Sequence, residues 1–312
     1  MVYINDVSGE WIEKDTSGDI PPYSRGYDVM VHVVKDKMIV IYTRGSGAYE
    51  VVMHSLDMNT WAWTRFHPQG TLFRRWGMSS WVHNGKIYCF GGAYDDHHFN
   101  DLHCFGNNDH MSWELTAQEG DIPSPRFRHW TIITGDTVFL FGGKGGERLY
   151  YDLHILDMGT LRWKMIHGNR PTSKWFFGLG FGKHNIHNFC PASSSTAALF
   201  CPNAIWLLDL QKAGQMQDPS AIWTKVPNPF RRQRHAAVLE PKSLMLWIIG
   251  GCIDNTGNSL SDVVKMSFKH SSLKNLAMEC VARNIGADDV RLLPKEIPIQ
   301  LKNEIECHRF RV

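Results

Sequence analysis

Tryptophan recurs along this chain at an interval close to fifty residues. Five tryptophans are separated by 52, 50, 50 and 60 residues, and each closes a short segment with the composition of a strand. They are Trp11, Trp63, Trp113, Trp163 and Trp223. Self-similarity at a period of about 20–50 residues is typical of repeat architectures. We therefore expect a series of similar structural units rather than one fold built around a single core.

Two further features recur in a fixed order within this interval. Three apolar strands end in Gly-Gly, at residues 87–92, 138–143 and 246–251. Strands that open with Asp-Leu-His follow at Asp101 and Asp152. Each period therefore contains a strand, a strand ending in Gly-Gly, a loop, a third strand and a strand carrying tryptophan. Four antiparallel strands in this order form one blade of a β-propeller, and the interval is that of kelch repeats.

The glycine pairs and the tryptophans have separate physical roles in such a blade. Because glycine has no Cβ, Gly-Gly lets neighbouring backbones approach where side chains would collide. Tryptophan supplies a large apolar surface through which one blade packs on the next. The sequence therefore predicts an all-β fold, a kelch β-propeller, over residues 1–270.

The two ends of the repeat region do not complete a blade. Residues 2–13 have the pattern of the last two strands of a blade, and the last repeat lacks its closing tryptophan strand. Two arrangements are open. The chain is an N-terminally incomplete six-bladed propeller, or the first half-blade joins the last repeat and closes five blades. A ring of blades that is not closed would expose sheet edges, which soluble proteins avoid. The choice between the two arrangements therefore matters for stability.

Charge, hydropathy and cysteine content argue against several classes of protein. The formal net charge is +2, from 33 basic and 31 acidic side chains, so we expect neither a nucleic acid nor an acidic membrane surface as partner. The best apolar run, residues 244–252, is under half the roughly 18 residues of a spanning helix. The N-terminus lacks a signal-peptide pattern, and the seven cysteines include no Cys-x-x-Cys pair. Reduced thiols and a location in the nucleus and cytoplasm are expected.

The motifs that would indicate an enzyme, a metal site or a cofactor site are weak. Residues 95–98 read Asp-Asp-His-His, but adjacent loop residues rarely complete a metal's coordination shell. Residues 178–182 lack the spacing of a dinucleotide-binding loop, and no Gly-x-Ser-x-Gly motif occurs. We expect no catalytic residues, no metal and no cofactor, and we disfavour a kelch-like oxidase or lyase.

The last part of the chain, residues 271–312, has a helical pattern. Apolar residues recur with helical periodicity from Ser271 to Gly286, and a second helix is expected to begin at Leu293-Pro294. These helices could cover a blade edge, or they could present an apolar face to a partner. We expect a propeller domain followed by this short helical tail.

Two motifs in the tail resemble the boxes through which substrate receptors attach to a ubiquitin ligase. In such boxes, apolar side chains on one helical face enter a groove of the partner. The elongin-C-binding box is matched by Leu273, Leu276 and Cys280. The cullin-2 box is matched by Leu293, Pro294, Ile297 and Leu301. Pro298 departs from a regular helix here, because it removes a backbone donor.

Kelch repeats followed by these two boxes resemble the kelch domain-containing proteins 1, 2 and 3, which are substrate receptors of cullin-2 RING ubiquitin ligases. The resemblance covers nearly the whole chain and includes residues 9–22, 141–154 and 249–252. It implies elongin B/C and cullin-2 as partners, and the C-termini of substrate proteins, often ending in glycine, as ligands. It also places the start of this chain inside the family's first blade, which favours the incomplete six-bladed arrangement.

The same resemblance implies a degron-binding site in the loops at one propeller face. Arginines of that family hold the terminal carboxylate, and a guanidinium can pair with a carboxylate bidentately while aromatic walls exclude water. The matching positions are Lys144, Arg148, His97, Phe99, Trp175, Phe176 and Arg234. Two alternatives are open: Lys144 and Arg148 are merely solvated loop charges, or the chain is a kelch scaffold that binds proteins without a ligase.

Overall fold

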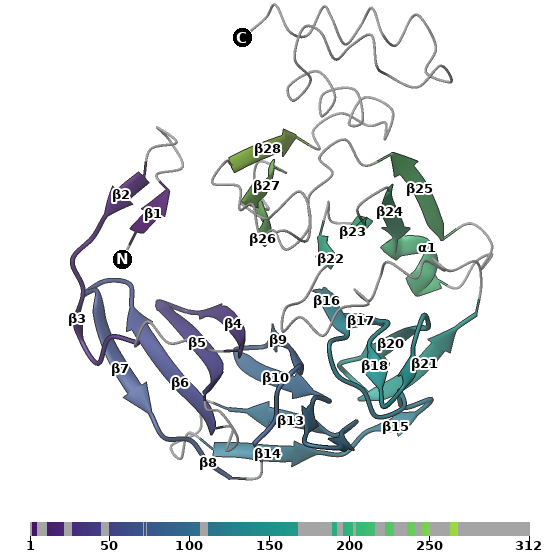
Figure 1. Cartoon of the computed structure of the whole chain (residues 1–312), viewed down its shortest axis with the longest axis horizontal. Coiled ribbons are helices and arrows are strands. Elements are labelled where there is room, and N and C mark those ends of the chain that lie inside the picture. The colour runs from purple at the N-terminus through teal and green to yellow at the C-terminus, as the bar shows by residue number, and fades with distance from the viewer. Residues whose placement is uncertain are drawn as a thin grey trace, which may run out of the picture. The chain divides into compact units, whose positions relative to one another are not determined.

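The computed structural model is almost entirely β-strand. It describes residues 2–4, 11–21, 27–44, 50–70, 72, 74–106, 112–167, 189–191, 196–201, 204–215, 222–227, 236–240, 245–249 and 263–267. Among these residues, α1 (Leu210–Gln215) is the only helix, and the strands form a succession of separate sheets (Figure 1). The chain divides into two compact units, Met1–Met165 and Ile166–Val312.

The first unit contains three five-stranded sheets with one topology. In the first sheet the order is β3-β7-β6-β5-β4, in the second β8-β14-β13-β10-β9, and in the third β15-β21-β20-β17-β16. The first comprises β3 (Ser17–Gly18), β4 (Tyr27–Val34), β5 (Lys37–Arg44), β6 (Glu50–Asp57) and β7 (Ala62–Phe66). The second comprises β8 (Gln69–Gly70), β9 (Ser79–His83), β10 (Lys86–Phe90), β13 (Leu102–Phe105) and β14 (Ser112–Thr116). The third comprises β15 (Glu119–Gly120), β16 (Trp130–Thr134), β17 (Thr137–Phe141), β20 (Leu153–Asp157) and β21 (Arg162–Ile166).

Within each sheet, four strands run antiparallel in chain order, as the repeat pattern predicts. The fifth, a two-residue strand, was not predicted: it pairs in parallel with the tryptophan strand at the sheet edge. Its glycine has a left-handed backbone, as at Gly70 with φ +108°, and passes so close to Trp113 that a Cβ would lie 2.1 Å from the Trp113 carbonyl oxygen. This close approach explains why the two-residue strand ends in glycine.

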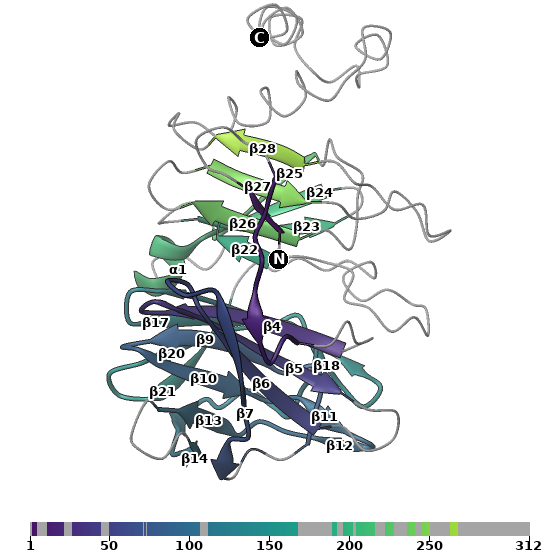
Figure 2. The same cartoon turned by 90° about the vertical axis from the view of Figure 1, so that its left-hand side faces the viewer.

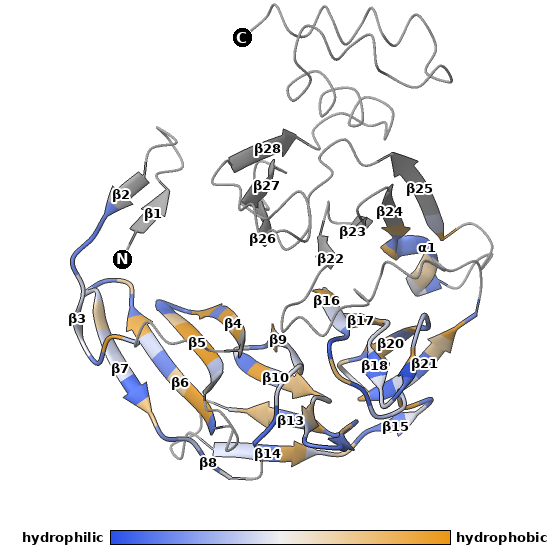
Figure 3. Cartoon of the chain, in the orientation of Figure 1, coloured by the Kyte–Doolittle hydropathy of each residue, from blue (hydrophilic) through white to orange (hydrophobic). Residues whose placement is uncertain are grey.

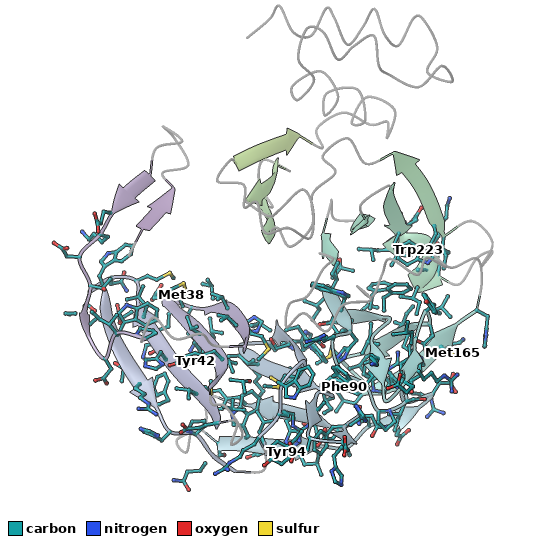
Figure 4. All side chains as sticks on the ribbon, viewed as in Figure 1. Met38, Tyr42, Phe90, Tyr94, Met165 and Trp223 are labelled. Atoms are coloured by element: carbon teal, nitrogen blue, oxygen red, sulfur yellow. The ribbon has the colours of Figure 1, made fainter. Side chains whose placement is uncertain are left out.

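The hydrophobic core lies between neighbouring sheets. One cluster joins Ile41 and Met53 of the first sheet to Ile87 and Trp113 of the second. Another joins the second sheet to the third, where the ring of Phe90 (labelled in Figure 4) lies 5.1 Å from that of Trp163. Residues of high hydropathy accordingly lie on strands such as β5, β6 and β10 (Figure 3). The predicted role of tryptophan in packing one blade on the next is confirmed at these positions.

The Gly-Gly pair of the second repeat also behaves as predicted. Gly91 has φ +66° and Gly92 has φ +101°, both in the left-handed region. A Cβ on Gly91 would lie 2.7 Å from the carbonyl oxygen of Arg126, which belongs to the next repeat. Glycine is therefore required here both by the backbone conformation and by the approach of a neighbouring backbone.

The second unit contains two further antiparallel sheets. The order in one is β22-β23-β24-β25, and α1 lies in the connection between its last two strands. The other has the order β26-β27-β28. The strands are β22 (Phe189–Pro191), β23 (Thr196–Cys201), β24 (Ala204–Asp209), β25 (Trp223–Pro227), β26 (Ala236–Glu240), β27 (Met245–Ile249) and β28 (Val263–Ser267).

At the other end of the chain, the expected half-blade is present as a pair of strands. β1 (Val2–Ile4) and β2 (Trp11–Glu13) are antiparallel, with Val2 opposite Glu13. The number of blades stays a prediction. The predicted helical tail, residues 271–312, lies outside the described residues.

Candidate functional site

Two buried arginines organise the loops at one end of the second and third sheets. Arg75 and Arg126 are 1% and 0% exposed. The guanidinium of Arg75 donates to both carboxylate oxygens of Asp101, at 2.5 and 3.0 Å, and that of Arg126 donates to Asp152 at 2.6 and 2.9 Å. Each arginine also donates to the carbonyl of the first glycine of the Gly-Gly pair that follows it. The arginines thus tie the start of each repeat to its central loop.

Each aspartate has a second partner in the histidine two residues later. His103 lies 2.8 Å from Asp101, and His154 lies 3.1 Å from Asp152. Burial alone would raise the pKa of Asp101, but the hydrogen bonds from His103 and Arg75 outweigh burial and hold that pKa well below its usual range. The same balance holds for Asp152. The aspartates of the two Asp-Leu-His motifs therefore supply the carboxylates that pair with the buried arginines.

An aromatic ring covers each of these guanidinium groups. The guanidinium carbon of Arg75 lies 4.0 Å from the centre of the Phe99 ring, and that of Arg126 lies 4.1 Å from the Tyr150 ring. Such cation–π stacking is favoured for a buried guanidinium. Phe99, a predicted degron-binding residue, therefore has one ring face against Arg75.

The loops after Gly-Gly fold into small hairpins on the same side of the first unit (Figure 2). One hairpin is β11 (Ala93–Tyr94) with β12 (His97–His98), and the other is β18 (Lys144–Gly145) with β19 (Arg148–Leu149). Each hairpin is also held to the segment that precedes the first strand of its own sheet. Lys144 and Phe127 exchange two backbone hydrogen bonds of 2.9 Å, for example. The hairpins are thus positioned by backbone pairing as well as by the buried arginines.

The structure places Lys144 and Arg148 on the two strands of the second hairpin. Lys144 lies opposite Leu149, and Arg148 lies opposite Gly145, so the two cations occupy adjacent register positions. Lys144 is half-buried and Arg148 is exposed, with its guanidinium carbon 5.2 Å from the centre of the Tyr150 ring. Neither cation forms an ion pair within the part of the chain that the structure describes. The hairpin therefore carries two cations, of which Arg148 stands beside the Tyr150 ring.

The two hairpins are joined by an aromatic cluster that the repeat pattern did not reveal. Trp76 and Phe127 meet edge to face at 4.8 Å, and His98 stacks on Phe127 at 5.1 Å. The backbone N–H of Gly146 donates to Nε2 of His98 at 3.3 Å, which links the first hairpin to the second. Arg128, with a left-handed φ of +54°, has its guanidinium carbon 5.0 Å from the Trp76 ring.

The remaining predicted site residues are only partly covered by the structure. His97 is exposed on the first hairpin, opposite Tyr94. Trp175, Phe176 and Arg234 lie outside the described residues. The same is true of the elongin-binding positions Leu273, Leu276 and Cys280 and the cullin-binding positions Leu293, Pro294, Ile297 and Leu301.

Two further features are absent from the described ranges, a metal-binding cluster and a membrane-spanning helix. No group of three or more His, Cys, Asp or Glu residues there could hold a metal ion, including the His-rich hairpin. No helix in those ranges is long and apolar enough to cross a membrane. The candidate site is the hairpin that carries Lys144 and Arg148, next to the aromatic cluster of Trp76, Phe127 and His98.

Comparison with known proteins identifies the repeats. Residues 1–189 match the family model described as the KLHDC2/KLHL20/DRC7 Kelch-repeats domain. Together with the repeated sheets, this match confirms the all-β kelch propeller fold.

The similar relatives include proteins of different total length. The chain is 27% identical over 282 residues to acyl-CoA-binding domain-containing protein 5 of Arabidopsis thaliana, covering 84% of this chain and 41% of that protein. It is 24% identical over 333 residues to kelch domain-containing protein 2 of Bos taurus, covering 94% of this chain and 79% of that protein. It is 36% identical over 148 residues to kelch domain-containing protein 3 of Bos taurus, covering 43% of this chain and 36% of that protein.

Proposed function

The chain belongs to the KLHDC2/KLHL20/DRC7 Kelch-repeats domain family, and from that premise we propose that it is the substrate-recognition subunit of a cullin-2 and elongin B/C ubiquitin ligase. Kelch repeats of this type are protein-interaction domains. The proposed ligand is the free C-terminus of a substrate protein, of the glycine-ended type. The proposed role is recognition rather than catalysis, in the nucleus and cytoplasm.

One observation carries the proposal. Lys144 and Arg148 lie on the two strands of one hairpin, and no carboxylate among the described residues forms an ion pair with either. A terminal carboxylate could pair bidentately with the Arg148 fork, while the Lys144 ammonium adds positive charge on the same hairpin. The Tyr150 ring contacts both the buried Arg126 and the exposed Arg148, which lowers the entropic cost of ordering the Arg148 guanidinium on a ligand.

Peptide binding tests the pocket. A peptide ending in glycine is expected to bind the protein with a free C-terminus and to bind much more weakly when amidated, as measured by fluorescence polarisation. Lys144→Glu with Arg148→Glu should abolish binding of the free peptide. Lys164→Glu, on the exposed face of β21, is the matched charge reversal and should leave binding unchanged. Equal binding of free and amidated peptides would contradict carboxylate capture.

The ligase attachment is tested separately, because the tail and the hairpin are distinct parts of the chain. Elongin C should be captured by the wild-type protein and lost when Leu273, Leu276 and Cys280 are changed to Asp. If the wild-type protein captures no elongin C but still binds peptide ends, the chain is a kelch interaction scaffold without a ligase.

A further inference from the structure

A second surface site lies between the first and second sheets, apart from the Lys144 hairpin. It is a pocket of about 220 Å³ at the start of β6 and the end of β7, closed on the other side by β8 and by Trp113 of β14. Val52 and Trp113 are 2% and 3% exposed and supply apolar surface, while Phe66 and Leu72 are half-buried. The volume lies below the roughly 300–1,000 Å³ of a drug-sized site, so it suits a group about the size of one residue.

The rim of this pocket carries more positive than negative charge. Arg65 and Arg74 both line it, against the single carboxylate of Glu50. Glu50 lies 3.8 Å from the Arg65 guanidinium, at the far limit of an ion pair. Nε of Arg65 is buried and makes no hydrogen bond to any described residue, and Arg74, which is exposed, forms no ion pair within the same ranges. The two rim guanidinium groups therefore keep N–H donors for a ligand that brings an acceptor.

The next repeat provides an internal comparison. A corresponding pocket in the second sheet uses equivalent positions: Asp101 for Val52, Leu115 for Arg65 and Ile122 for Leu72. No arginine lines that pocket, and its one carboxylate, Asp101, is already paired with Arg75. The fold therefore produces the groove in both repeats, whereas the arginines are specific to the first. The cations are not required for the blade to form.

We propose that the pocket between β6, β7, β8 and β14 binds a carboxylate attached to a small apolar group. Arg65 and Arg74 hold the carboxylate, and Val52, Phe66 and Trp113 receive the apolar part. Such a ligand could be a free small-molecule acid or an acidic residue beside an apolar one in a peptide, and both present the same chemistry to the pocket. The site does not depend on the proposed ligase function.

Trp113 lines the pocket and serves as the spectroscopic reporter of ligand binding. The protein is labelled with 5-fluorotryptophan, and the ¹⁹F resonance of Trp113 is assigned by its loss in Trp113→Phe. Titration with 4-methylpentanoate should move this resonance in a saturable manner, and 4-methylpentanamide should bind about tenfold more weakly, as loss of charge-assisted hydrogen bonds implies. If Trp113→Phe does not fold, chemical-shift changes of the wild-type resonances with acid and amide still give the two affinities.

Variants identify the groups responsible. Arg65→Gln with Arg74→Gln should weaken the acid by about tenfold, while Glu50→Gln should tighten it, because a competing carboxylate is removed from the rim. Arg162→Gln, at an exposed arginine paired with Glu119 elsewhere, is the control and should leave the affinity for the acid unchanged. An amidated peptide with an internal Leu-Glu pair, competing for the same shift, would assign the site to peptides; its failure to compete would assign it to small acids. Equal affinity for acid and amide, or no effect of the arginine substitutions, overturns the proposal.

Discussion

The side chains of Ser79 and His129 are hydrogen bonded across the boundary between the second and third sheets, with 2.7 Å between Oγ and Nε2. Ser79 begins β9, and His129 directly precedes β16. On the opposite side of β9, Ser80 makes the equivalent bond, also 2.7 Å, to His32 of β4. Two consecutive serines of one strand therefore connect the second sheet to both of its neighbours.

These histidines make the first unit sensitive to acid. Burial lowers the pKa of His129 to about 3 and that of His32 to about 4, from an ordinary value of 6.5. A histidine with a lowered folded-state pKa favours folding above its unfolded pKa, so the contribution is lost as the pH falls below 6.5 towards the folded value. We expect the free energy of unfolding to fall below pH 6.5 by about 1.4 kcal/mol per pH unit for each histidine.

Substitution of His129 isolates the contribution of this residue to the pH dependence of the free energy of unfolding. His129→Gln keeps a hydrogen-bonding group for Ser79 but does not titrate, so the decline between pH 6 and pH 4 should become shallower. Urea unfolding followed by tryptophan fluorescence at several pH values measures it. Gln118→Leu, a destabilising change at a side chain that does not titrate, is the control and should leave the slope unchanged. An identical slope in His129→Gln would mean that His129 is not neutral in the folded protein.

The buried Arg126–Asp152 pair is expected to be costly to break on one side only. Asp152→Asn leaves the guanidinium without its counter-charge in a buried site, which should lower the free energy of unfolding by about 3–5 kcal/mol. Replacing both residues, as Arg126→Met with Asp152→Leu, should cost clearly less than the sum of the single changes. The exposed pair Arg162–Glu119 is the control, and Arg162→Gln should cost about 0–1 kcal/mol. If the losses in free energy of unfolding of the two single variants simply add up in the double variant, this expectation is wrong.

Two glycines with a left-handed backbone allow the energetic cost of backbone strain to be measured apart from that of a steric clash. Gly85 has φ +74° and no atom within 4 Å of the position that a Cβ would occupy, whereas Gly91 has φ +66° and a neighbour at 2.7 Å. Gly85→Ala should therefore cost only the strain of a left-handed alanine, about 1–2 kcal/mol. Gly91→Ala should cost more, because the carbonyl of Arg126 must also move. Thermal unfolding of the two variants measures the difference, and equal melting temperatures would rule out a tight contact between the repeats.

A double-mutant cycle tests how the tryptophan of the third sheet is held. The indole Nε1 of Trp163 donates to Oε1 of Gln118 at 2.8 Å, and Trp163 is 1% exposed. Gln118→Leu should cost about 1–3 kcal/mol, because the buried N–H loses its acceptor. In a Trp163→Phe background the same change should cost almost nothing, since phenylalanine has no donor. Urea unfolding of the four proteins gives the coupling energy, and a coupling near zero would show that water replaces Gln118.

Much of the fold could be predicted because its signals are local. A strand's alternation and a left-handed glycine are properties of a few consecutive residues, so the four-stranded repeats, the Gly-Gly turns and the packing role of Trp113 and Trp163 were all recognisable. The parallel edge strands, such as Gln69–Gly70, were missed because two residues carry no periodicity. The cations Lys144 and Arg148 were found by resemblance, but their placement on the two strands of one hairpin was not.

The sequence by itself determined the class of architecture: repeated antiparallel sheets, their tryptophan and glycine positions, and the residue types of the central loops. Only the tertiary structure decided which charges are available to a ligand. Arg75 and Arg126 look like surface cations in the sequence, yet both are buried against Asp101 and Asp152, each 26 residues further on. Four other cations carry the same charge but line a surface pocket, as Arg65 and Arg74 do, or lie on a hairpin, as Lys144 and Arg148 do. The reason is physical: ion pairing and burial depend on which distant segments meet in space, and no local pattern specifies that meeting.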